Sequence, residues 1–121
     1  MNYPWLEEYF LSKLGAEKEF KPEWDAFRYM ICGKMFGLQG TDKTGKGIIT
    51  LKLEPAMGQC LRDRYPTDIT SGYYMNKEHW NSVDLNGVVP DEILKDMIDK
   101  SYRLIYAALP KKLRIYGDNT E

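Results

Sequence analysis

The sequence has few of the residues that usually carry catalysis or metal binding. It contains one histidine and two cysteines in 121 residues. Cys32 and Cys60 lie far apart in the chain, without the CxxC spacing of a zinc or redox site. We expect both to be reduced thiols in a cytoplasmic protein, and a disulfide between them is the alternative. The sequence therefore predicts no metal site and no cofactor.

Long hydrophobic runs and an excess of one charge are also absent. No apolar run approaches the roughly 18 residues of a membrane span, and the N-terminus "MNYPWLEEYF" lacks the basic start of a secretory signal. Seventeen Lys and Arg residues balance eighteen Asp and Glu residues, for a net charge of −1. Proteins dedicated to nucleic acid are usually basic, so this function would need a local basic patch. We expect no membrane partner.

No motif of nucleophilic catalysis is present. His79 can be combined with Ser71 or Ser82 and Asp84 into a triad on paper, but neither serine lies in a GxSxG turn. Nothing marks either cysteine as an activated nucleophile beside His79. We therefore expect a non-enzymatic protein.

The segment "GTDKTGK" at residues 40–46 resembles the start of a phosphate-binding loop. Gly47 stands where that loop needs a serine or threonine for magnesium, and the apolar segment "IITLKL" that follows is typical of a strand. A phosphate-binding loop leads instead into a helix N-terminus. We interpret these residues as a glycine-rich hairpin loop.

Periodicity predicts three helices. The first covers residues 3–14 and ends at Gly15, the second begins at Glu54-Pro55 and ends before Pro66, and the third begins at Pro90. The expected inward positions are Met57, Cys60, Leu61 and Tyr65 in the second helix, and Leu94, Met97, Ile98, Ser101, Ile105 and Ala108 in the third. We expect the Ser101 hydroxyl to bond the preceding helical turn.

Five strands are predicted between these helices. Residues 26–38 form a hairpin that turns at Cys32-Gly33, residues 47–53 form a third strand, and two short strands lie near 70–75 and 81–85. Residues 16–24 are expected to be a charged connector. The order α-β-β-β-α-β-β-α predicts an α+β fold in which a mostly antiparallel sheet packs against three helices. Residues 1–110 form the single domain, and residues 111–121 form a basic exit and a loose tail.

Four segments closely resemble the MmcQ/YjbR family of small bacterial proteins, in order from about Trp5 to Leu109. They are "GKMFGL", "LKLEPAMGQCLRDRYP", "SGYYMNKEHWNSVDLNG" and "VPDEILKDMIDKSYRLI". The matching residues are Lys34, Phe36, Lys52, Tyr73, Tyr74, Lys77, His79, Trp80, Asn81, Ser101 and Tyr102. The resemblance implies a domain similar to the CyaY/frataxin architecture. It also implies DNA binding, through a proposed double-wing arrangement. Frataxin-like iron binding would need a more acidic first helix than one that offers Glu7 and Glu8.

DNA is the first candidate partner. Lys34, Lys52, Lys77, Arg62 and Arg64 are the candidate phosphate contacts, and Tyr73, Tyr74 and Trp80 are candidates for stacking on bases. Alternation places Lys52 and Thr50 on the sheet face opposite Ile49, Leu51 and Leu53. Lys34 is expected to share a strand face with Phe36 and Leu38. The alternative interpretation is that these lysines only make the surface hydrophilic.

A small anionic ligand, or else another protein, is the second candidate partner. Lys77, His79, Trp80 and Asn81 are close together in sequence and could form a pocket for it. The alternative for Trp80 is an aromatic anchor at the edge of the core, with His79 and Asn81 bonding the turn. The sequence does not choose between a ligand site and an anchor, and we expect a monomer.

Overall fold

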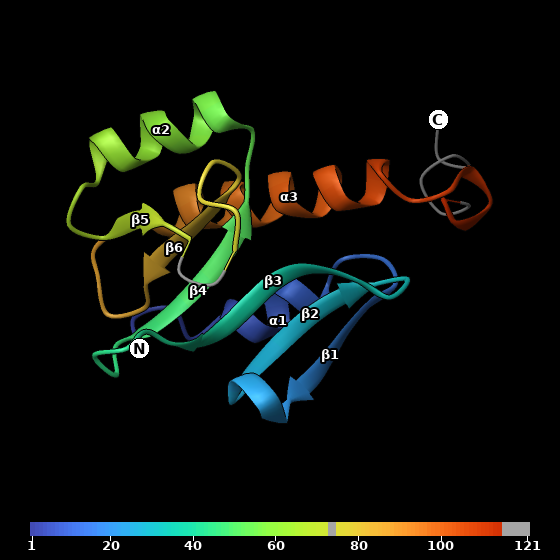
Figure 1. The fold of residues 1–121 in the computed structure, drawn as a ribbon, viewed down its shortest axis with the longest axis horizontal. Coiled ribbons are helices and arrows are strands. Elements are labelled where there is room, and N and C mark those ends of the chain that lie inside the picture. Colours follow the sequence, from blue (N-terminus) through green and yellow to red (C-terminus); the bar gives the residue numbers. More distant parts are fainter. Residues whose placement is uncertain (73–74, 115–121) are drawn as a thin grey trace.

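A six-stranded antiparallel sheet with the order β1-β2-β3-β4-β6-β5 forms the centre of the molecule (Figure 1). The computed structural model describes residues 1–72 and 75–114. The strands are β1 Ala16–Lys21, β2 Ala26–Ile31, β3 Lys34–Thr41, β4 Gly47–Lys52, β5 Ile69–Ser71 and β6 Trp80–Asp84. The helices are α1 Leu6–Leu11, α2 Pro55–Arg64 and α3 Asp91–Ala107, with short 3-10 helices η1 Pro22–Trp24 and η2 Lys111–Leu113. The predicted α+β class is confirmed.

The predicted connector at residues 16–24 is wrong, because residues 16–21 form the edge strand β1. Its first four residues alternate between half-buried and exposed positions, but Phe20 is also exposed and charged side chains occupy both faces. Glu19, for example, pairs with Arg28 of β2 across the strands. Edge strands are commonly charged, which protects them from pairing with other chains. A search for apolar alternation therefore does not detect this strand.

The first and second helices differ from the prediction. α1 covers only residues 6–11. Before its start, Tyr3 is buried and its hydroxyl donates a hydrogen bond of 2.9 Å to the carbonyl of Val89. In α2 the buried positions are Gly58 and Leu61, whereas Cys60 is exposed. The predicted inward residues Met57 and Tyr65 are half-buried and pack against the core, so the predicted stripe is wrong only at Cys60. In α3 five of the six predicted inward residues are buried, but Ala108 is exposed and Leu109 is buried instead.

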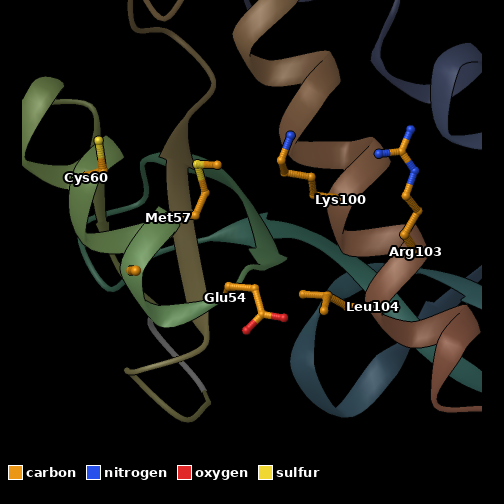
Figure 2. Close-up of a pocket in the computed structure, with 7 residues that line it drawn as sticks. Glu54, Met57, Cys60, Lys100, Arg103 and Leu104 are labelled. Atoms are coloured by element: carbon orange, nitrogen blue, oxygen red, sulfur yellow. The ribbon is translucent and has the colours of Figure 1, made fainter.

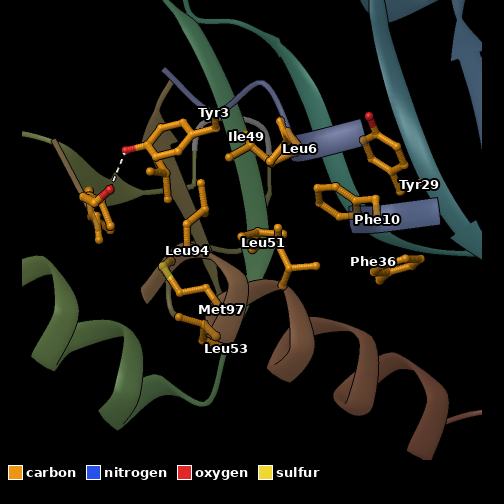
Figure 3. Packing of buried hydrophobic residues seen from close by; sticks show 14 of the residues in the cluster. Tyr3, Leu6, Phe10, Tyr29, Phe36, Ile49, Leu51, Leu53, Leu94 and Met97 are labelled. Atoms are coloured by element: carbon orange, nitrogen blue, oxygen red, sulfur yellow. Dashed lines mark hydrogen bonds between the residues drawn. The ribbon is translucent and has the colours of Figure 1, made fainter. Parts of the chain in front are cut away.

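The helices cover one face of the sheet, and the main core lies between them and the strands (Figure 3). Ile49, Leu51 and Leu53 of the β4 segment are fully buried in this core, as predicted. The ring of Phe10 in α1 stacks on Tyr29 in β2, with centroids 3.9 Å apart and an interplanar angle of 9°. The stack is possible because Gly37 of β3 has no side chain. A Cβ atom on this residue would lie 2.5 Å from Phe10 Cε1.

Polar contacts between α1 and α3 hold the first helix against the core. The hydroxyl of Tyr9 donates a hydrogen bond of 2.7 Å to Asp99 Oδ1, and Lys13 forms an ion pair with the same carboxylate. Burial, together with the hydrogen bond to Asp99, raises the pKa of Tyr9 to about 12. The Tyr9 phenol therefore stays protonated as a donor throughout the physiological pH range.

The centre of the opposite sheet face is also buried. Leu38, Thr50 and Ser82 lie side by side on neighbouring strands and are at most 4% exposed. The hydroxyls of Thr50 and Ser82 form a hydrogen bond of 2.8 Å. This pairing satisfies two polar groups that would be costly to bury alone. The polar residues Thr50 and Ser82 therefore do not mean that this part of the sheet face is exposed to solvent.

The sheet divides between β3 and β4, and Ser101 of α3 lies at the division. The two strands pair only from Thr41↔Gly47 to Leu38↔Thr50, and Figure 1 shows β4 turning away from β3 beyond this point. Ser101 Oγ donates a hydrogen bond of 2.7 Å to the carbonyl of Phe36 and accepts one of 2.9 Å from the backbone N–H of Lys52. The prediction that this hydroxyl bonds its own helix is wrong. It replaces one rung of the sheet ladder instead.

The loop at residues 41–46 is the predicted hairpin loop between two strands. Asp42 Oδ1 accepts hydrogen bonds from the backbone N–H groups of Thr44 and Lys46, at 2.9 and 3.0 Å, and from the Thr44 hydroxyl. The hydrogen bond from Thr44 is the main reason why the pKa of Asp42 is below its usual value. Amides that a phosphate-binding loop would direct at a phosphate are thus bound to a carboxylate. None of the described helices is long and apolar enough to span a membrane.

We expect Gly37→Ala to lower the free energy of unfolding by about 1–3 kcal/mol, because the new methyl group overlaps the buried Phe10 ring. Urea titration followed by circular dichroism measures this change. Gly47→Ala in β4 is the matched control, since its Cβ would lie 3.9 Å from the nearest atom, Leu85 Cδ1. The control should be neutral or raise stability by up to about 1 kcal/mol. Equal effects of the two substitutions would contradict the role of the stack.

Ser101→Ala should lower the free energy of unfolding by about 1–3 kcal/mol or more. The reason is that two backbone groups lose their partner where the sheet divides. Thermal and urea unfolding measure the loss. Ser12→Ala is the control. Its exposed hydroxyl donates to the carbonyl of Tyr9, and its removal should change stability by no more than about 0.5 kcal/mol. A loss no larger than that of the control would show that Ser101 does not support the sheet.

Candidate functional site

Lys52 and Trp80 lie side by side on the sheet face that points away from the helices. They are register partners in the β4–β6 pair and are both half-buried. Lys77 is exposed in the segment before β6, where the Trp80 N–H donates to the Asn76 carbonyl at 3.0 Å. The Leu53 N–H donates to the His79 carbonyl at 2.7 Å and holds this segment against the end of β4. Lys52, Lys77, His79 and Trp80 therefore belong to one region, which we call the Lys52 face.

Asn81 does not belong to the Lys52 face. It is register partner of Leu51, so its side chain points to the helix side of the sheet, where it is fully buried under Gly58 of α2. Its Oδ1 accepts a hydrogen bond from Arg62, and its Nδ2 donates one of 3.2 Å to the His79 carbonyl. The predicted Lys77–Asn81 cluster is thus split, because Trp80 and Asn81 lie on opposite faces of the sheet. The Asn81 side chain binds Arg62 instead of a ligand.

Lys34 and Arg64 lie at other places. Lys34 is exposed at the start of β3, beyond the point where β3 and β4 stop pairing. A register shift between Tyr29 and Met30 makes Phe36 an extra residue in β3. Phe36 therefore faces the main core while Leu38 faces the other way, and the expected common face for the two residues is wrong. Arg64 is exposed at the end of α2, with its guanidinium 5.5 Å from the centre of the Tyr65 ring.

The five predicted phosphate contacts share one electrostatic property. Within residues 1–72 and 75–114, no carboxylate oxygen lies within 4.0 Å of their charged nitrogens. Cations near α1 and β1 differ, since Lys13, Lys18 and Arg28 each form an ion pair. Lys34, Lys52, Lys77 and Arg64 therefore keep their charge available to a ligand, whereas Arg62 is held by its hydrogen bonds to Asn81 and Gln59. Tyr73 and Tyr74, the other predicted stacking residues, lie outside the described residues.

A groove between α2 and α3 is the site that sequence reasoning missed. It has a volume of about 600 Å³ and is lined by Glu54, Ala56, Met57, Cys60, Lys100, Arg103 and Leu104. Figure 2 shows Met57 of α2 and Leu104 of α3 extending toward the space between the helices. The only sequence signal for this groove is the apolar residues Ala56, Met57 and Cys60 of α2. This signal is hidden because Met57 and Cys60 also fit the pattern of a helix face that points to the core. Nothing in the sequence of α3 marks Leu104 as its partner.

The described residues contain no group of three or more His, Cys, Asp or Glu side chains that could hold a metal ion. Cys32 and Cys60 are both free and exposed thiols.

Two Escherichia coli proteins are similar to this chain in sequence. The chain is 28% identical over 109 residues to the uncharacterised protein YjbR of Escherichia coli strain K12, which covers 90% of this chain and 91% of that protein. It is 37% identical over 93 residues to the uncharacterised protein YbdF of Escherichia coli O157:H7, which covers 77% of this chain and 73% of that protein.

Solved structures show the same fold. A crystal structure of a protein from Deinococcus radiodurans matches with a TM-score of 0.80 at 26% identity, covering 90% of this chain and 82% of that one. A crystal structure of a Pseudomonas syringae protein matches with a TM-score of 0.70 at 26% identity, covering 86% of this chain and 98% of that one. The family model described as YjbR matches residues 11–104, and this chain therefore belongs to the YjbR family.

Proposed function

We propose that this chain is a non-enzymatic binding module whose ligand is nucleic acid, with DNA as the first candidate. The observation that carries the proposal is the position of Lys52 beside Trp80 on neighbouring strands. An ammonium group without a carboxylate partner within the described residues and a half-buried tryptophan are adjacent there. Phosphate contacts by lysine supply affinity, and an aromatic ring can stack on an unpaired base. The ligand would therefore bind across the Lys52 face.

The other predicted cations have graded roles in this proposal. Lys77 is exposed next to Trp80 and would contact an adjacent phosphate. Lys34 and Arg64 would contribute outer phosphate contacts from the start of β3 and the end of α2. Arg62 would act mainly by positioning α2, because it donates to Asn81 and to Gln59 Oε1, the latter at 3.1 Å. Such contacts do not read base sequence, so we expect weak sequence preference.

Binding to a labelled duplex and a labelled single strand should weaken steeply with salt. If Lys34, Lys52 and Lys77 each neutralise one phosphate, the duplex affinity should fall by about 40-fold between 50 and 200 mM salt. Fluorescence anisotropy at several salt concentrations measures this slope. Lys52→Glu/Lys77→Glu should abolish binding at 200 mM salt and lower the slope by about one unit for each lost lysine.

The control is Lys43→Glu/Lys112→Glu, which changes the net charge equally at two exposed lysines outside the Lys52 face. It should retain most of the affinity. If both double variants lose affinity equally, the attraction is a general charge effect. If the unmodified protein does not bind at 50 mM salt, nucleic acid is not the ligand.

Trp80→Ala tests whether this ring is a binding residue or an anchor. Trp80 is half-buried and lies outside the main core cluster, so we expect a loss of stability below the about 3–5 kcal/mol of a fully buried aromatic. Loss of a stacking ring should weaken single-strand binding by about 1–3 kcal/mol, whereas Trp80→Phe should retain much of it. Chemical unfolding and anisotropy on the same samples separate the two effects. A large loss of stability with unchanged affinity per folded molecule would identify an anchor.

A further inference from the structure

The groove between α2 and α3 is a second surface with the character of a ligand site. It lies among the helices, whereas the Lys52 face points away from them, so it is separate from the proposed nucleic-acid surface. α2 packs against β5, and α3 packs against β3 and β4. The two helices therefore leave a space of about 600 Å³ between them. Pockets for small organic ligands typically measure roughly 300–1,000 Å³.

The walls of the groove are apolar. Ala56 and Met57 contribute from α2, and Leu104 contributes from α3. Leu104 is half-buried and does not belong to the main core cluster, so its side chain is available to a ligand. Methionine adapts its shape easily and is common on surfaces that bind apolar groups. The body of a suitable ligand is therefore apolar.

The groove has an acidic residue, Glu54, at one end and two basic residues, Lys100 and Arg103, toward the other. Figure 2 shows Lys100 and Arg103 extending in the same direction from α3, away from the end where Glu54 lies. Lys100 forms an ion pair of 2.7 Å with Asp96, whereas Arg103 has no ion pair with any carboxylate in the described part of the chain. A guanidinium is a planar donor that matches a carboxylate or a sulfonate. The cationic end would therefore receive the anionic group of a ligand.

We propose that this groove binds a free small organic anion, with its apolar body between Met57 and Leu104 and its single carboxylate or sulfonate at Arg103. A ligand with an anionic group at both ends would place one of them beside Glu54 and is disfavoured. An uncharged ligand would lack the contact with Arg103 and would bind less tightly.

The first test uses 8-anilinonaphthalene-1-sulfonate and N-phenyl-1-naphthylamine, which share the same ring system but differ in the sulfonate. Fluorescence titration of the folded protein should give the tighter binding for the sulfonate. Arg103→Gln should weaken sulfonate binding by about threefold to fivefold, as expected for an exposed ion pair, and should leave the uncharged probe unchanged. Equal affinity of the two probes, or an Arg103→Gln variant that binds like the unmodified protein, would overturn the assignment.

A matched pair of variants locates the probe on the protein. Leu104→Glu places a carboxylate on the groove wall and should remove most of the sulfonate binding. Leu11→Glu is the control, because Leu11 is a leucine at a second hollow, beside α1, that is lined by Glu7 and Glu8. This acidic hollow should repel an anion, so its variant should bind as the unmodified protein does. A loss of binding in Leu11→Glu that equals the loss in Leu104→Glu would place the probe elsewhere and overturn the proposal.

The two cysteines provide a test that needs no substitution. Both thiols are exposed, but only Cys60 lines the groove, while Cys32 lies in the turn between β2 and β3. A saturating concentration of the sulfonate should slow the alkylation of Cys60 by iodoacetamide and leave the rate at Cys32 unchanged. Peptide mass spectrometry measures both rates in one sample. Saturated probe fluorescence with no protection of Cys60, or with equal protection of both thiols, would exclude the groove as the site.

Discussion

The hydroxyl of Ser101 connects the two halves of this fold. β1, β2 and β3 form one half with α1, and β4, β6 and β5 form the other with α2. Ser101 Oγ bonds the backbone of Phe36 in the first half and of Lys52 in the second, at the point where β3 and β4 separate. This buried hydroxyl lets β4 leave the ladder without leaving two backbone groups unpaired. Both candidate sites contain neighbours of these residues. Lys52 belongs to the Lys52 face, while Lys100, next to Ser101, and Glu54, just after β4, line the groove.

A second buried polar contact determines how α2 lies on the sheet. Gly58 allows the helix to approach Asn81 so closely that a Cβ atom would lie 2.8 Å from its Oδ1. Arg62, one turn further along the helix, donates to the same oxygen. The buried face of α2 is therefore centred on Gly58, Leu61 and Arg62, while Met57 packs at the edge of the core and lines the groove together with Cys60. Asn81, which the sequence suggested as part of a ligand site, therefore positions α2, and α2 forms one wall of the groove.

The sequence predicted the parts of the fold that depend on apolar periodicity. It correctly indicated the β2–β3 hairpin, the inward face of β4 and most of the buried face of α3. It did not predict β1, whose charged residues occupy both faces, or the start of α1 at Leu6, which follows the buried Tyr3 and its hydrogen bond to the distant Val89. The roles of Ser101 and Asn81 depend on backbone groups that are remote in sequence. No local pattern specifies such partners.

The balance of charges in the composition conceals their distribution in space. A net charge of −1 argues against nucleic-acid binding only if acidic and basic residues are mixed evenly. In this chain, some carboxylates of α1, β1 and α3 bind nearby cations, as in Lys18–Glu7, Arg28–Glu19 and Lys100–Asp96. These three acidic groups are therefore paired locally, whereas Lys52, Lys77 and Arg103, like the carboxylates of Glu54 and Glu78, have no ion pair in the described part of the chain. Because charge is screened within about 8 Å at physiological salt, a ligand responds to these local groups rather than to the total charge.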